Sequence, residues 1–480
     1  MMKIIKGGDI LASGGFGCVF KPALKCKNST INVDDNTVSK LMTAKHATDE
    51  YNQIQAFKTV LEHIPNYKKY FLVDDFSLCQ PEELESVDLQ LFDKKCKALV
   101  KKKFTRTNIN QLLDKVLAIN MPDGGVDIKG FLKKIREQNK NNQNKNNQNN
   151  NNNNNNQNKN NQNKNNQNNN QINTAYTQLN NSLIDMLING IIPMNKLDLY
   201  HCDVKNGNIL VKENNGLECR LIDWGLSVHH TNNNGIPHRL YRRPFQYNVP
   251  FSVILFNKDF TRRYAEFMVT LDKENKKLDM FYLKEFVTNY IFAWNKIRGI
   301  GHLKIINSII QKLTRHDLTE IKKEKIKKHV MEYNFTYGYI VEYISCILLK
   351  FTVDGEFKLL NYFNNVFLKT IDIWGFVMNY LIFLNDFGDY DDLNQSQIEF
   401  IDKIKYIVIH YLFESPTEVI DVNKLVKELQ ELNSIIMQFF VNTNTNLGNG
   451  ITKSIGKRYK SKKVGQNKTR NKTRNKRSKK

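Results

Sequence analysis

The sequence predicts a mixed α+β protein with two lobes, a small β-rich lobe followed by a large helical lobe. Short apolar segments around one helical pattern fill residues 1–121, which is typical of a β-rich lobe. Residues 122–445 have mostly helical apolar spacing. With 480 residues, of which 40% are hydrophobic and 11% aromatic, the chain can build a sizeable core. Residues 446–480 are predicted to form a disordered basic tail.

A glycine-rich segment begins the predicted small lobe. It joins two apolar strand patterns and reads Leu11-Ala12-Ser13-Gly14-Gly15-Phe16-Gly17-Cys18-Val19. Glycine lets backbone N–H groups approach phosphate oxygens without a Cβ in the way. The same residues also suit an ordinary hairpin turn, because short motifs recur by chance. The segment therefore indicates a phosphate-binding hairpin only together with motifs that lie further along the chain.

Two charged residues follow the glycine-rich segment. Lys40 lies in a short apolar strand pattern, and Glu50 lies in the helical pattern that comes next. We predict that Glu50 pairs with Lys40, and Glu62 is the alternative if the helix starts later. The segment Val116–Gly125 is typical of a last strand that ends in a Pro-Asp-Gly turn. We predict that this strand closes the small lobe.

The most informative motif lies in the predicted large lobe. It reads His201-Cys202-Asp203-Val204-Lys205-Asn206-Gly207-Asn208, and Leu221-Ile222-Asp223-Trp224-Gly225 follows it. Asp203 can accept the proton of an attacking hydroxyl, and Lys205 can balance the charge of a migrating phosphoryl group. Asn208 and Asp223 offer the oxygen ligands that Mg²⁺ prefers. Asp203 precedes Asn208 by five residues, which is the spacing of a phosphotransferase catalytic loop.

Taken in order, these motifs resemble those of the eukaryotic-type protein kinase family. The resemblance implies a bilobal protein-kinase-like fold, ATP and Mg²⁺ as cofactors, and transfer of the γ-phosphate of ATP to a hydroxyl. It implies catalytic roles for Asp203 and Lys205, and coordination of the metal by Asn208 and Asp223. It also implies nucleotide contacts for Leu11, Ala12, Ser13, Gly14, Gly15, Phe16, Gly17, Cys18, Val19, Lys40, Glu50 and Met121.

The chain departs from the family pattern at several positions. Ala12 replaces the first glycine of the loop, and Trp224 replaces the phenylalanine of Asp-Phe-Gly. Cys202 replaces the arginine of His-Arg-Asp, which in the family receives the phosphate of the activation segment. We therefore expect no control by phosphorylation of that segment, which residues 227–250 should form. No Ala-Pro-Glu follows, and residues 244–251 stand in its place.

The expected acceptor class depends mainly on Lys205. Serine/threonine kinases carry a lysine two residues after the base. Aminoglycoside and choline-type phosphotransferases share the Ile-Asp-Trp sequence but usually carry another residue at that position. We therefore predict transfer to serine and threonine hydroxyls of a protein substrate. A small-molecule phosphotransferase is one alternative, and a pseudokinase scaffold without catalysis is another, although a scaffold would not need the charged residues of the catalytic loop.

Two insertions interrupt the pattern. The tract 138–171 contains only asparagine, glutamine and lysine, and we predict disorder because these residues cannot form a core. Residues 251–370 have helical spacing with aromatic faces, and we predict a helical insert that packs structurally, with a partner-docking surface as the alternative. After this insert, Asp372 lies in a segment that resembles the large-lobe helix whose aspartate supports the catalytic-loop backbone. A helix N-cap is the alternative for Asp372.

Most of the formal net charge of +23 belongs to two segments. Residues 451–480 contribute +14 and the tract 138–171 contributes +4, which leaves +5 for the rest of the chain. The tail 451–480 therefore suits one of two roles. It either acts as a solvated extension, or it captures nucleic acid or another anionic partner without sequence preference.

The seven cysteines are scattered without Cys-X-X-Cys spacing, which favours an intracellular, reducing compartment and argues against a zinc site. We expect no signal peptide and no membrane span, because charges interrupt the most apolar run, Tyr337–Val353. The motifs and the asparagine-rich composition together resemble the serine/threonine kinases of giant DNA viruses such as mimivirus. That resemblance implies the host cytoplasm or the virion as the location, with the nucleus as an alternative.

Overall fold

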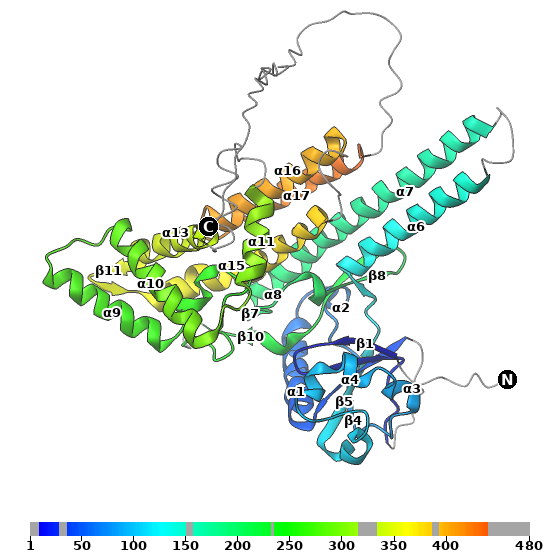
Figure 1. Ribbon diagram of the computed structural model, residues 1–480, viewed down its shortest axis with the longest axis horizontal. Helices are drawn as coiled ribbons and strands as arrows, with labels where there is room; N and C mark the ends of the chain where they lie inside the picture. Colours follow the sequence, from blue (N-terminus) through cyan, green and yellow to red (C-terminus); the bar gives the residue numbers. More distant parts are fainter. Residues whose placement is uncertain are drawn as a thin grey trace, which may run out of the picture. The chain divides into compact units, whose positions relative to one another are not determined.

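The computed structural model describes residues 9–27, 36–149, 157–231, 235–314, 334–385 and 393–439. Within these residues the protein has a mixed α+β structure (Figure 1). A small antiparallel sheet region comes first in the chain, and a larger helical part follows it. The predicted α+β class is thus confirmed. The basic tail lies outside the described residues.

The first part of the chain is built on a five-stranded antiparallel sheet. Its strands, in the spatial order β1-β2-β3-β5-β4, are β1 (Asp9–Ser13), β2 (Gly17–Lys21), β3 (Thr37–Thr43), β5 (Val116–Pro122) and β4 (Ser77–Cys79). The helices of this part are α1 (Ala44–Leu61), α2 (Tyr67–Tyr70), α3 (Ser86–Leu89), α4 (Phe92–Lys95), α5 (Lys97–Val100) and the 3-10 segment η1 (Ile109–Lys115). The predicted order of strands, one long helix and further strands is confirmed, and the short helices after β4 were not predicted.

Two small apolar clusters hold this sheet from its two sides. One contains Cys18, Leu41 and Ala118, together with buried residues of α4 and α5. The other contains Met42 and Ile119 on the side where α1 packs. The alternation follows from the two-residue period of a strand, which sends neighbouring side chains to opposite faces.

Four of the seven cysteines are paired in the first part of the chain. Cys18 is bonded to Cys96, and Cys26 is bonded to Cys79. The three remaining cysteines, all in the larger part, are free. The spacing of the cysteines did not indicate these pairs. Cys18 and Cys96 are separated by 78 positions, and Cys26 and Cys79 by 53, so each pair meets only when the sheet folds. The predicted compartment is not tested by the pairing and stays a prediction.

The larger part begins with strand β6 (Val126–Asp127) and continues through helices and short strands to the predicted catalytic loop. Its first elements are α6 (Ile128–Asn149), α7 (Gln157–Met186), the π segment η3 (Leu187–Ile191), α8 (Ile192–Lys196), β7 (Leu199–Tyr200), η4 (Asn206–Asn208), β8 (Ile209–Glu213), β9 (Leu217–Leu221), η5 (Trp224–Leu226) and β10 (Val228–His229). Strands β6, β8 and β9 form one small sheet, and β7 pairs with β10 in another. The catalytic loop therefore connects two short sheets.

The remaining elements are almost all helical. They are η6 (Phe251–Leu255), α9 (Lys258–Lys273), α10 (Met280–Arg298), α11 (Leu303–Thr314), α13 (Asn334–Phe351), β11 (Thr352–Val353), β12 (Glu356–Phe357), α14 (Leu359–Tyr362), η7 (Phe363–Phe367), α15 (Leu368–Met378), η8 (Asn379–Asn385), α16 (Gln395–Val408), η10 (Ile409–Phe413) and α17 (Val422–Ile436). One extended apolar core joins these helices to α7 and to the segments beside the catalytic loop. Trp294 and Trp374 are among its largest fully buried side chains. The predicted helical insert 251–370 is confirmed for its described residues, with the small β11–β12 hairpin as an addition.

The prediction of disorder over 138–171 differs from the structure. Helix α6 continues to Asn149 and α7 begins at Gln157, so the described part of the tract is helical, while residues 150–156 lie outside the described residues. The two helices lie side by side in Figure 1, and residues of both are in contact. The physical reason is that Ile128 and Leu183, both buried, anchor helices that need no new nucleus to extend.

One helical stretch, Leu359–Leu384, is long and apolar enough to cross a membrane by length and composition alone. No such stretch was expected from the sequence. Within the protein 89% of the most apolar 18-residue window of this stretch is buried, which is also typical of a core helix. The stretch contains Asp372, whose side chain is fully buried.

Candidate active site

The glycine-rich segment forms the turn between β1 and β2. Gly14 N donates to Gly17 O at 3.0 Å, and nothing lies within 4 Å of a Cβ built at Gly14. A Cβ at Gly17 would lie 2.3 Å from Leu41 O of β3, so this glycine is required by the sheet itself. Phe16, at the tip, is 45% exposed, and its ring lies 5.1 Å from that of His46. The predicted hairpin is confirmed, and sheet packing explains only one of its glycines.

The register of the sheet aligns several predicted residues on one face. Val19 of β2 is paired with Lys40 of β3, and Lys40 is paired with Ile119 of β5. Directly paired residues of antiparallel strands point to the same side. Ala12 pairs with Val19, and Met121 lies two residues beyond Ile119, so both share that side. The predicted nucleotide residues of three strands therefore lie on a common face with Lys40.

Cys18 lies on the opposite face, contrary to the prediction of a nucleotide contact. Its side chain is fully buried and bonded to Cys96. The strand's two-residue period turns Cys18 away from the side that carries Val19. Leu11 and Ser13, two other predicted contacts, are exposed at the edge of the hairpin. We therefore remove the side chain of Cys18 from the candidate site.

Lys40 connects the sheet with the larger part of the protein. Its Nζ lies 2.6 Å from Glu50 Oε1 of α1 and 3.5 Å from Asp223 Oδ1. Burial alone would lower the pKa of Lys40, but the carboxylates of Asp223 and Glu50 outweigh it and raise the pKa above its usual value. The lysine therefore stays charged at neutral pH. The predicted Lys40–Glu50 pair is confirmed, and Glu62, the alternative, caps the far end of α1.

Burial has the opposite effect on the carboxylate partner. Burial raises the pKa of Asp223, but the positive charge of Lys40, with a smaller effect from Lys205, exceeds it, so the pKa lies below its usual value. Asp223 is therefore ionised at neutral pH. Its side chain is 42% exposed, so the carboxylate can also reach a ligand in solvent.

The predicted catalytic loop, residues 201–208, is held at its first residues by Asp372 of α15. Asp372 Oδ2 accepts from His201 N at 2.8 Å and from Asn195 Nδ2 at 2.8 Å, while Oδ1 accepts from Cys202 N at 2.7 Å. Asp372 is fully buried in the middle of its helix. The prediction that this aspartate supports the catalytic-loop backbone is thus confirmed, and the N-cap alternative is wrong.

Asp203, the predicted base, has a hydrogen-bond donor on each oxygen. Oδ2 accepts from Lys205 Nζ at 2.6 Å and from Asn208 Nδ2 at 3.0 Å. Oδ1 accepts from Asn248 Nδ2 at 2.9 Å. The carboxylate is buried, and any rotation of it would break at least one of these hydrogen bonds. The loop thus brings three predicted residues together and adds Asn248 from the segment that follows.

Asn208 and Asp223 can hold a divalent cation together. Both hydrogen bonds of the Asn208 amide are made by its nitrogen, to Asp203 O and Oδ2, so its oxygen is the atom left for a cation. The backbone N–H of Ile222 donates to the backbone carbonyl of Asn208 at 2.9 Å, which keeps the segments that carry Asn208 and Asp223 adjacent. Among the residues that the structure describes, no three His, Cys, Asp or Glu side chains gather as a metal site. Two protein ligands, completed by phosphate and water, suit Mg²⁺.

His201 is held in its neutral form. Its Nε2 lies 2.9 Å from Ile222 O, and its Nδ1 is buried without a partner. Burial lowers the pKa of His201 below its usual value, although the nearby carboxylates, Asp372 first, oppose this. The ring packs 5.1 Å from Trp224, which in turn packs against Phe57 of α1. Trp224 is buried, so the larger ring replaces phenylalanine without leaving the core.

The predicted activation segment, residues 227–250, contributes residues to the site that the motifs did not identify. Arg243 Nη1 donates to Cys202 O at 3.0 Å, and Arg239 Nη1 donates to Gly225 O at 2.5 Å. Asn248 reaches Asp203 as described above. Their only signal in the sequence is their place inside the residues predicted to form this segment. Cys202 itself is fully buried, and burial raises the pKa of its thiol well above the usual value, which agrees with the expected packing role.

The helical insert also reaches the site, at the loop Gly299–His302 between α10 and α11. His302 N donates to Phe245 O at 2.9 Å, and the imidazole ring lies 5.6 Å from the ring of Tyr247. Burial lowers the pKa of His302, and the charge of Lys205 lowers it further. The insert therefore contacts the segment that carries Asn248. Periodicity alone gave no sign of this contact.

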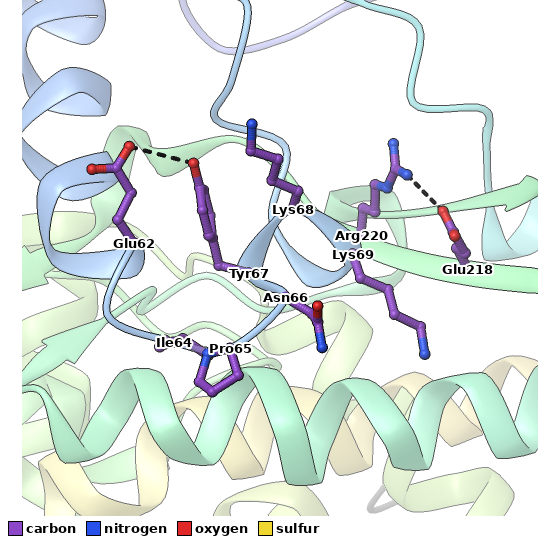
Figure 2. Close-up of a pocket in the computed structure, with 9 residues that line it drawn as sticks. All are labelled: Glu62, Ile64, Pro65, Asn66, Tyr67, Lys68, Lys69, Glu218 and Arg220. Carbon is purple, nitrogen blue, oxygen red and sulfur yellow. Dashed lines mark hydrogen bonds and ion pairs between the residues drawn. The ribbon is translucent and has the colours of Figure 1, made fainter.

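Apart from the candidate site, a hollow lies where the end of α1 and helix α2 meet strand β9 (Figure 2). It is lined by Glu62, Ile64, Pro65, Asn66, Tyr67, Lys68, Lys69, Glu218 and Arg220. Its charges are largely compensated, since Arg220 lies 2.6 Å from Glu218 and Lys69 lies 2.6 Å from Asp185. None of the residues in the predicted site lines this hollow, and we assign it no function.

Comparison with known proteins does not narrow the assignment. No model of a known protein family matches the chain, and no curated protein sequence matches it either. The functional argument therefore rests on the residues and contacts described above.

Proposed function

We propose that the protein is an ATP-dependent protein kinase with a bilobal kinase fold that phosphorylates serine and threonine hydroxyls. The observation that carries the proposal is the position of Lys40. Its ammonium group contacts both Glu50 and Asp223, although Asp223 lies 183 residues further along the chain. A lysine held between two carboxylates beside a glycine-rich hairpin is the arrangement that phosphoryl transfer from ATP needs.

The chain's own residues support specific roles. Mg²⁺–ATP, when bound, supplies a transferable phosphoryl group whose charge is partly neutralised by the metal. Lys40 would bind phosphate oxygens, and Asn208 and Asp223 would hold the metal. Asp203 would accept the hydroxyl proton of the acceptor, since Lys205 and Asn248 orient its two oxygens. These roles need positioning and charge compensation rather than covalent chemistry.

The contact between Lys205 and Asp203 favours a protein hydroxyl as the acceptor. Lys205 Nζ lies 2.6 Å from Asp203 Oδ2, so its charge lies beside the atom that would receive the proton. Residues 244–251 reach this pair through Asn248, whose amide donates to Asp203 Oδ1 and Val204 O. A small-molecule acceptor remains the competing assignment, and the choice of acceptors in the assay separates the two.

A panel of acceptors with matched lysine variants tests the proposal. Purified protein is incubated with Mg²⁺ and γ-labelled ATP in the presence of casein, histone, an aminoglycoside or choline. Lys40→Met, in β3, is compared with Lys45→Met, which removes an exposed lysine five residues further along, in the first turn of α1. We expect label on serine and threonine of the protein acceptors, about 100-fold less with Lys40→Met, and no loss with Lys45→Met.

Two results would count against this assignment. Label on the aminoglycoside or on choline alone would make the protein a small-molecule phosphotransferase. Equal labelling by the two lysine variants would show that Lys40 has no part in the reaction.

A further inference from the structure

The catalytic loop lacks a cation at the position before Asp203. Cys202 stands there, fully buried and uncharged, with φ of +58°. A non-glycine residue adopts this left-handed conformation only where its surroundings fix it. The Cys202 backbone has two such contacts, because its N–H donates to Asp372 Oδ1 and its carbonyl accepts from Arg243 Nη1. Asp372 was expected from the sequence, and Arg243 was not.

Arg243 enters this site from the activation segment. Its side chain is buried, with 6% of the residue exposed, and only one of its two terminal nitrogens has a hydrogen-bond partner, since Nη2 is buried without one. A buried arginine is costly unless negative charge lies close by. The acidic groups that act on it are Asp203 and Asp372. Of the two other arginines in the segment, Arg239 donates to Gly225 O, and the Arg242 carbonyl accepts from Arg298 Nε.

We propose that Arg243 is the positioning residue that keeps the catalytic loop and the activation segment in register, in place of the arginine that Cys202 replaces. This inference deepens the proposed kinase function and rests on it for its catalytic readout. The guanidinium binds the backbone carbonyl that precedes Asp203 in the chain. The buried carboxylates of Asp203 and Asp372 act electrostatically on its charge. The segment therefore carries its own cation to the loop and needs no phosphate to bridge the two.

The contacts of the segment on both sides of Arg243 support this role. Before it, Arg239 is bound to Gly225 O, and after it, Asn248 is bound to Asp203 Oδ1. Trp374 Nε1 donates to Tyr247 O at 3.0 Å between these points. Of these contacts, the one made by Arg243 brings a buried positive charge to the backbone of the loop. Loss of the guanidinium should therefore displace Asp203 without removing any group that binds nucleotide.

Three variants of Arg243 test the inference, with Arg262→Met as a matched control on the exposed face of α9. Arg243→Met keeps the bulk and removes the charge, and we expect kcat to fall about 100-fold while KM for ATP changes less than about threefold. Arg243→Lys should recover part of kcat. Arg243→Ala should be rescued by low, non-denaturing guanidinium chloride, which a purely structural defect would not be. Phosphatase treatment of the unsubstituted protein should leave its rate unchanged.

Hydrogen exchange keeps this inference separate from the proposed function. In Arg243→Met, amides of residues 199–208 and 239–250 should exchange at least tenfold faster than in Arg262→Met, while those of α16 and α17 stay unchanged and show that the protein is folded. Absent phosphoryl transfer by the unsubstituted protein would overturn the proposed function, and exchange would then decide the role of Arg243 alone. Unchanged exchange in both segments, or wild-type kcat in Arg243→Met, would overturn the inference.

Discussion

At the scale of single residues, the site depends on His201 staying neutral. Its Nε2–H points to Ile222 O, and its Nδ1 has no partner, so protonation would place an unsatisfied N–H in the core. The ring also supports Trp224, which follows Asp223 directly. Protonation of His201 would therefore disturb the packing of Trp224, which is the neighbour in sequence of Asp223, the carboxylate that contacts Lys40.

This environment predicts a loss of stability in acid. In the folded protein the pKa of His201 lies below the usual value of 6.5. Above pH 6.5 the residue is therefore mostly neutral in the folded and in the unfolded protein, and it does not lower the free energy of unfolding. Below pH 6.5 the unfolded chain binds a proton that the folded protein does not. The free energy of unfolding should therefore fall by up to about 1.4 kcal/mol per pH unit as pH decreases from 6.5.

Urea denaturation at pH 7.5 and pH 5.5 measures this effect. His201→Gln keeps an N–H donor for Ile222 O and cannot titrate, so its free energy of unfolding should change less between the two pH values than that of the unsubstituted protein. The same pH dependence in both proteins would show that His201 is not the responsible group.

The sequence predicted the charged residues of the site and the supporting Asp372, but it missed Arg243 and Asn248. Lys40, Asp203 and Asp223 could be found because phosphoryl transfer requires these residue types at restricted spacings. Arg243 and Asn248 could not, because a segment of irregular backbone has no period from which its contacts follow. Their roles depend on which carbonyl or carboxylate lies beside them after folding.

At the scale of elements, strands were easier to predict than their cross-links and connections. Alternating apolar residues indicated β2, β3 and β5, and the register then placed Val19 beside Lys40. The pairing of Cys18 with Cys96 depends instead on helices α4 and α5, whose four-residue lengths leave no periodic signal. In the part of the protein built on the five-stranded sheet, the long-range contacts of short elements are therefore what sequence patterns could not predict.

The loop Gly299–His302 predicts a role for the helical insert in ordering the activation segment. Gly301 has φ of +52°, and a Cβ there would lie 2.3 Å from Phe245 O. Gly301→Val should push the segment away from α11 and lower kcat about 10- to 100-fold. Gly299→Ala is the matched control, since Gly299 also has positive φ but nothing lies within 4 Å of its Cβ.

Steady-state kinetics and hydrogen exchange of residues 242–248 measure the effect of both glycine variants. Faster exchange and lower kcat in Gly301→Val than in Gly299→Ala would support contact between the insert and the segment. Equal behaviour of the two variants would mean that backbone strain, and not this contact, explains any loss.

The asparagine-rich helices should contribute little to stability. Apolar side chains that α6 and α7 bury, such as Phe131 and Leu179, lie near the ends that join the rest of the protein. Replacing residues 142–168 with a short Gly-Ser linker should therefore change the free energy of unfolding by less than about 1 kcal/mol. Leu179→Ala, in the anchored half of α7, should cost about 2–5 kcal/mol.

Chemical denaturation of the linker variant and of Leu179→Ala measures this difference. A loss of more than about 2 kcal/mol on replacement of the tract, comparable to that of a buried leucine, would mean that the tract makes stabilising contacts that its composition does not suggest.

At the scale of the whole molecule, the net charge of +23 predicts salt-dependent binding of nucleic acid. Fourteen lysines and arginines lie in residues 451–480, outside the described residues. If this tail captures nucleic acid, affinity for single-stranded DNA should fall at least about 10³-fold between 50 and 200 mM salt, without sequence preference. A chain ending at Phe439 should lose this binding.

Fluorescence anisotropy with DNA of two unrelated sequences measures the tail's contribution. Binding that favours one sequence, or that is unchanged in the chain ending at Phe439, would contradict capture by the tail. Absence of binding at 50 mM salt would leave the tail as a solvated extension.

The rate of phosphoserine and phosphothreonine formation with saturating Mg²⁺–ATP tests the central proposal most directly. Asp203→Asn keeps the shape of the side chain and removes the base, and kcat should fall about 10²- to 10⁴-fold while ATP still binds. Asp198→Asn, at an exposed position five residues earlier, should keep the rate of the unsubstituted protein. Equal rates of the two variants, or no transfer to any protein by the unsubstituted chain, would contradict a protein kinase that uses Asp203 as its base.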